Sequence, residues 1–138
     1  MRHRLLLALG LALTSLLLLF GGVAADDGGR RLTATLAGAG SGSAEFVLNP
    51  GQGTICYTLS FEGLETPAFA AHIHALSTGQ VVVPLSVPSP QTTAGTVSAC
   101  TTAPRDVIVA ILSHPEEYYV NVHNATHPGG AIRGTLTG

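Results

Sequence analysis

The sequence predicts an all-β protein that folds as an antiparallel Greek-key β-sandwich, with at most one short helix near residues 104–113. Two observations support this fold class. Short runs alternate apolar and polar residues with a period of two, which is typical of strands that bury one face. Clusters of Gly, Pro, Asn and Ser separate these runs and favour turns between them.

The first 25 residues have the pattern of a signal peptide. A basic start at residues 1–4 precedes an apolar run over residues 5–20, and Val23-Ala24-Ala25 supplies the small residues that signal peptidase accepts. The alternative is an uncleaved anchor, because residues 5–25 are long enough to span a bilayer. We expect residues 26–138 to form a single domain that is secreted, periplasmic or attached to the cell surface, without a membrane contact after cleavage.

The start of this domain is expected to form a three-stranded meander. Residues 30–37 alternate, residues 38–42 form a glycine-rich turn, and residues 43–48 form the second strand. Residues 53–61 alternate most clearly, with apolar side chains at the odd positions from 55 to 61. Cys56 therefore falls on the opposite, non-core face.

The middle of the domain continues with a strand over residues 69–74. Its apolar face is predicted to consist of Phe69, Ala71 and Ile73. Its outward face then carries two histidines, His72 and His74. Residues 80–85 form a further apolar run, and residues 87–94, with two prolines, are expected to be a loop.

Residues 104–113 are the one candidate helix. Pro104 suits a first helical turn, and the carboxylate of Asp106 suits the positive end of a helix. A strand is the alternative, because β-branched residues dominate residues 107–111. Two further strands follow, over residues 118–123 and 130–136.

These last two strands place further polar side chains on the non-core face. Val120 and Val122 belong to the apolar face of residues 118–123, which leaves Tyr119, Asn121 and His123 opposite. Ile132 and Leu136 are the apolar residues of the final strand, and Arg133 lies on its other face. Three histidines, at positions 72, 74 and 123, are thus expected on the outer surface of the sheet.

We interpret His72, His74 and His123 as a candidate site for one copper or zinc ion. Residues two apart on a strand have Cα atoms about 6.5 to 7 Å apart and point the same way, so two imidazoles can meet at one ion. His114 and His127, each beside a proline, are more typical of surface residues than of ligands. The alternative is that all these histidines are solvated surface groups.

Three neighbours could support such a site. Asn121 lies on the same face as His123 and could orient a ligand ring by a hydrogen bond, and Tyr119 could lie beside the ion. Arg133 could hold an anion near the ion, or pair with Glu116 or Glu117.

Cys56 and Cys100 are expected to form one disulfide, because an exported chain folds in an oxidising compartment. A metal bound by cysteine is the alternative, but neither cysteine has a C-x-x-C partner. Four arginines face eight acidic residues within 26–138, which argues against a nucleic-acid partner. Residues 124–126 form a glycosylation sequon.

Several strings resemble the CHRD domain, the repeat named from the developmental regulator chordin. They are Ala71-His72-Ile73-His74, Ser98-Ala99-Cys100, Tyr118-Tyr119-Val120-Asn121-Val122-His123 and Gly130-Ala131-Ile132-Arg133-Gly134. The resemblance extends over residues 32–136 and implies a single CHRD domain at 26–138. It implies little chemistry, because the molecular activity of that family is poorly defined.

A more distant resemblance concerns the copper/zinc superoxide dismutases. His72-Ile73-His74 is similar to their His-Val-His, the strand ending at His123 is similar to a later ligand strand, and Arg133 resembles their active-site arginine. The chain departs from that family because residues 105–112 offer none of the zinc ligands. The resemblance implies a dismutase-like sandwich, with an immunoglobulin-like one as the alternative, and at most one metal ion.

Three functions remain open from the sequence. The first is an exported protein that binds one copper or zinc ion through the three histidines. The second is a module without metal that binds an extracellular protein or matrix partner. The third is an enzyme, a copper-only superoxide dismutase.

Overall fold

The computed structural model describes residues 28–138, so the predicted signal peptide lies outside the described residues. Eight strands, one α-helix and one 3-10 helix follow in the order β1 (Arg30–Gly38), β2 (Gly40–Asn49), β3 (Thr54–Glu62), β4 (Ala68–Ala75), β5 (Val81–Leu85), β6 (Gly95–Thr102), α1 (Arg105–Ser113), η1 (Pro115–Glu117), β7 (Tyr118–Asn124) and β8 (Ile132–Thr135). Among the described residues, no helix combines the length and apolar character that a membrane crossing needs.

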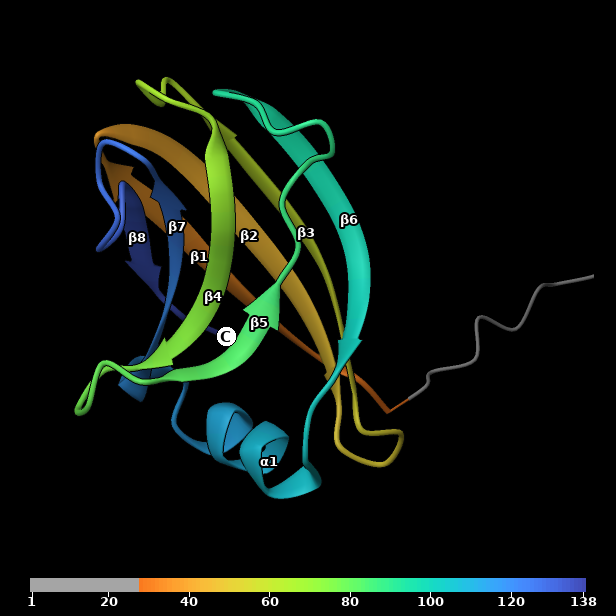
Figure 1. The fold of residues 1–138 in the computed structure, drawn as a ribbon. Helices are drawn as coiled ribbons and strands as arrows, with labels where there is room; N and C mark the ends of the chain where they lie inside the picture. Colours follow the sequence, from red (N-terminus) through yellow and green to blue (C-terminus); the bar gives the residue numbers. More distant parts are fainter. Residues whose placement is uncertain (1–27) are drawn as a thin grey trace, which may run out of the picture.

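All strands belong to one antiparallel sheet with the order β5-β4-β7-β8-β1-β2-β3-β6. Strands β1 and β8 pair only through Ala37 with Arg133 and Gly38 with Ile132. The sheet bends on both sides of this short β1–β8 pairing. The two halves face each other across the core, and α1 lies across one end (Figure 1). The predicted antiparallel sandwich is confirmed, in a form close to a barrel.

The connections place non-consecutive strands side by side. The first three strands form the predicted meander, after which the chain crosses to the other half for β4 and β5. It returns for β6, which pairs with β3, and crosses again through α1 to β7, which pairs with β4. This last crossing joins two histidine-bearing strands that are distant in the sequence.

The core lies between the two halves and is closed by α1. Its largest fully buried side chains come from every part of the domain and include Phe46, Leu32, Leu36, Leu48, Ile55, Leu59, Ile73, Ile108, Ile111, Ile132 and Leu136. The helix prediction over residues 104–113 is confirmed: α1 buries Ile108, Ile111 and Leu112, which share one helical face.

The structure corrects three details. Phe69 is 46% exposed instead of buried, because an irregularity between Ala68 and Ala70 shifts the register of β4 with β7 and places Ala68 in the core. The turn expected over residues 38–42 is much tighter, since β1 and β2 pair as far as Gly38 with Gly40. Residues 95–102, to which the alternation assigned no strand, form β6.

Candidate metal centre

Two neighbouring strands bring the three predicted histidines together. His72 and His74 lie on β4, and His123 lies on β7. These strands pair with Ala70 opposite His123 and His74 opposite Tyr119. Ile73, Val120 and Val122 fill the core on the inner face of the same strands, so alternation sends the histidines to the outer face.

The three side chains converge closely enough to share one ion. Each histidine offers one ring nitrogen, and these three nitrogens lie within 4.8 Å of one another. The Nδ1 atom of His72 is 3.0 Å from the Nε2 atom of His123. Two nitrogens bound to one ion at about 2.0–2.1 Å lie roughly 2.9 to 4.1 Å apart, so the widest pair must approach slightly on binding.

Backbone carbonyls orient two of the rings. The Nδ1–H of His74 donates to the carbonyl of Gly79 at 2.9 Å, and the Nδ1–H of His123 donates to the carbonyl of Pro128 at 2.9 Å. A ring that donates through Nδ1 keeps its lone pair on Nε2, so Nε2 is the atom that each of these two rings would offer to a metal ion.

The Nε2 atom of His74 has no hydrogen-bond partner among residues 28–138. His74 is 6% exposed, and its Nε2 is buried without a hydrogen bond. An unpaired polar atom at such a depth is unfavourable unless something binds it. A metal ion at the centre of the three histidines would supply that partner.

His72 is the least buried of the three histidines. Burial lowers the pKa of His72 below its ordinary 6.5, and the neighbouring charges of His123 and then His74 lower it further. The ring is therefore neutral at neutral pH, as a metal ligand must be. Its Nδ1–H donates to the Nε2 of His123, so ligation through Nδ1 requires that proton to move to the other ring nitrogen.

Aromatic and cationic side chains pack around the three histidines. The ring of Tyr119 stacks on that of His74, with centroids 5.0 Å apart and an angle of 10° between the planes. The guanidinium carbon of Arg133 lies 5.8 Å from the centroid of Tyr119. Phe69, which the sequence placed in the core, packs beside His123 with ring centroids 6.3 Å apart.

Asn121 does not orient a ligand ring directly as predicted. Its side-chain amide donates to the carbonyl of Gly129 at 3.2 Å, in the loop that also contains Pro128. Because Pro128 accepts the hydrogen bond from His123, Asn121 supports the site through this loop. Periodicity could not identify the contributing carbonyls of Gly79 and Pro128, although both lie in turns that directly follow ligand strands.

The remaining candidate residues lie apart from the three histidines. His114 contacts Glu116 at 3.5 Å and His127 contacts Glu65 at 3.7 Å, as expected for surface groups. Within residues 28–138, Arg133 makes no ion pair with Glu116 or Glu117. The sequon residue Asn124 is fully buried.

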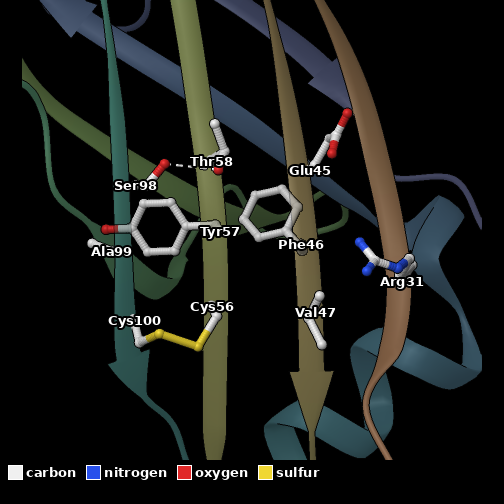
Figure 2. Close-up of a pocket in the computed structure, with 10 residues that line it drawn as sticks. All are labelled: Arg31, Glu45, Phe46, Val47, Cys56, Tyr57, Thr58, Ser98, Ala99 and Cys100. Carbon is white, nitrogen blue, oxygen red and sulfur yellow. Dashed lines mark hydrogen bonds between the residues drawn. A yellow bond between two sulfur atoms is a disulfide. The ribbon is translucent and has the colours of Figure 1, made fainter. Parts of the chain in front are cut away.

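The predicted disulfide between Cys56 and Cys100 is present, which leaves neither thiol free for a metal. It joins β3 to β6, in the half of the sheet that does not carry the histidines (Figure 2). A shallow cavity of about 390 Å³ lies beside it, lined by Arg31, Glu45, Tyr57 and Ser98 among others. It contains none of the three histidines.

A comparison with protein families finds the CHRD domain, whose family model matches residues 27–136. Neither a curated protein nor a solved structure matches this chain.

Proposed function

The chain belongs to the CHRD domain family, and we propose that it binds a single copper or zinc ion through His72, His74 and His123. The observation that carries this proposal is the buried Nε2 of His74, which has no hydrogen-bond partner among the described residues. His74 also belongs to a group of three histidines that can each place one ring nitrogen within 4.8 Å of the others. A cluster of surface histidines would leave each such nitrogen accessible to water.

The hydrogen bonds suggest how each ring would ligate. His74 and His123 would use Nε2, because their Nδ1–H groups are held by carbonyls, and His72 would use Nδ1, the atom nearest His123. Three neutral imidazoles suit Cu(I), Cu(II) and Zn(II), and the general order of affinities favours copper among the divalent ions. Three protein ligands leave a position for water or a small exogenous ligand.

We further propose that the protein acts outside the cytoplasm. The signal-peptide pattern of residues 1–25 and the Cys56–Cys100 disulfide both suit an oxidising compartment. Backbone carbonyls already orient the rings of His74 and His123, so the site would bind an ion without large rearrangement.

Calorimetric titration of residues 26–138 with Cu(II) and Zn(II), with EPR of the copper form, tests the proposal. We expect one ion per chain and nitrogen hyperfine structure in the EPR spectrum. His74→Gln should abolish both, whereas His114→Gln, at an exposed histidine outside the cluster, should change neither. Equal binding by the two variants would refute the three-histidine site.

A second candidate function is recognition of an extracellular protein or matrix partner. Phe69, Leu76 and Val81 are large apolar residues exposed on β4, on β5 and in the turn between them. Isolated exposed apolar residues are common, but Leu76 and Val81 lie together around the turn between β4 and β5, at the edge of the sheet, which favours contact with another surface. Wild-type behaviour of His74→Gln in every cellular assay would favour this function over metal binding.

Superoxide dismutation is a third candidate for the copper-loaded form. The guanidinium of Arg133 lies over Tyr119, which stacks on His74, so a positive charge is held beside the cluster. A superoxide assay of the copper-loaded protein and of Arg133→Ala tests it. Turnover no faster than that of free copper would exclude this activity.

A further inference from the structure

Strand β6 is an edge of the sheet without the features that normally protect edges. Among the described strands it pairs with β3 alone, and its residues, Gly95–Thr102, include neither a charged residue nor a proline. The opposite edge, β5, has five residues and includes Pro84. Short length and proline are common means of blocking an edge, and β6 lacks both. We propose that β6 pairs with β6 of a second copy of this chain, so that the sheet continues across a symmetric dimer.

The register of β6 with β3 identifies the backbone groups available for pairing. Cys56 lies directly opposite Cys100, with Cα atoms 3.9 Å apart. A spacing this short is typical of non-hydrogen-bonded pairs, in which the N–H and C=O groups point away from the neighbouring strand. Alternation then directs the backbone groups of Thr96, Ser98, Cys100 and Thr102 outward.

No other segment that the structure describes hydrogen-bonds to these groups. Among the backbone hydrogen bonds that link turns, loops and different elements of residues 28–138, none involves these four residues. Four donors and four acceptors are thus exposed on one edge. An antiparallel strand of matching length would satisfy all of them.

The edge is complementary to itself. In the antiparallel register centred on Ala99, that residue lies on the two-fold axis, Ser98 faces Cys100 of the second copy, and Thr96 faces Thr102 of the second copy. This arrangement brings each outward backbone group to a partner and places small, uncharged side chains opposite one another. A strand with charged residues would meet no counter-charge on β6.

The outer face of β6 already forms the side-chain contacts that such a dimer would extend. The hydroxyl of Thr58 lies 2.9 Å from that of Ser98, and the hydroxyl of Ser60 lies 2.8 Å from that of Thr96. Figure 2 shows the first of these pairs beside the disulfide. Thr96 and Thr102 would continue the same row of hydroxyl groups into the second copy.

The dimer would leave the metal centre accessible. The three histidines lie on β4 and β7, in the other half of the sheet. The proposal therefore does not depend on metal binding, and the two can fail separately.

Sedimentation equilibrium of residues 26–138, the part of the chain that contains every described element, tests the dimer. We expect twice the monomer mass at tens of micromolar for the wild type. Ser98→Pro should give monomers, because it removes an outward N–H without removing a hydrogen bond to β3. Ser98→Ala keeps that N–H and should remain dimeric. Far-UV circular dichroism checks that each variant is folded.

Ser98→Lys gives a second test if the proline variant unfolds, because it places like charges close to the two-fold axis and should also give monomers. A monomeric wild type would overturn the proposal. So would a folded Ser98→Pro or Ser98→Lys variant that keeps the dimer mass, and so would open-ended assembly of the wild type.

Discussion

Replacing Gly130 by alanine is expected to weaken metal binding, although Gly130 lies outside the ligand set. The residue has a φ of +126°, a conformation that side chains with a Cβ rarely adopt. A Cβ built there would lie 2.6 Å from both polar atoms of the Asn121 side chain. Asn121 and Gly130 therefore cannot both keep their positions.

The displacement should reach His123 through the loop. Asn121 holds the Gly129 carbonyl, and the adjacent Pro128 carbonyl accepts the hydrogen bond that orients His123. Loss of such an orienting contact typically lowers metal affinity about 10- to 100-fold. The strained backbone should also lower the free energy of unfolding by about 1–3 kcal/mol. That loss corresponds to a decrease in Tm of roughly 4 to 12 °C in a domain of this size.

Gly129→Ala is the matched control. Its Cβ would meet no atom within 4 Å, and Gly129 is not among the glycines with positive φ. Both variants are compared by thermal unfolding without metal and by competition with a chelator of known affinity. If Gly130→Ala and Gly129→Ala bind zinc and copper equally well, the loop does not position His123, and the reasoning is refuted.

Three further predictions concern acid sensitivity, the disulfide and the buried sequon. The pKa of His72 is lowered in the folded state. The contribution of His72 to the free energy of unfolding is therefore fully present above pH 6.5 and declines below it, because His72 takes up a proton more readily in the unfolded chain. Urea unfolding at several pH values should show that the free energy of unfolding falls less with decreasing pH in His72→Gln than in the wild type. An equal fall in the two proteins would contradict this prediction. The double variant Cys56→Ser/Cys100→Ser should lower the free energy of unfolding in urea by about 2–5 kcal/mol. An unchanged urea midpoint of unfolding would show that the disulfide does not stabilise the fold. Asn124 bonds the Thr66 carbonyl and the backbone N–H of His127, so Asn124→Ala should destabilise by about 1–3 kcal/mol in the same assay. Mass spectrometry of folded protein from a glycosylating host should find no glycan at Asn124, and a glycosylated native fold would be contrary to its burial.

Alternation predicted much of the fold because each half of the sheet buries one face. The odd positions of β3 are buried and the even ones are more exposed, as the period of two requires. The same rule placed His72, His74 and His123 on the outer face before any pairing was known. It failed at Phe69, because an irregularity between Ala68 and Ala70 changes which residue reaches the core.

Strand β6 was not predicted because its core-facing residues are only partly buried. Val97 and Ala99 are each half covered at the edge of the sheet, and the sequence there is rich in Thr, Ser and Gly. Such a segment has too little hydrophobic contrast for the period of two to be visible. Only its long-range pairing with β3 makes it a strand.

By itself, the sequence determined the all-β class, the disulfide pair and the three histidines that share a face, because these follow from local alternation and residue chemistry. Tertiary structure alone decided that β4 and β7 are neighbours, that the three ring nitrogens lie within 4.8 Å, and that carbonyls of two turns orient the rings. Strand pairing and turn geometry depend on contacts between residues distant in the chain, and a pattern with a period of two contains no information about such contacts.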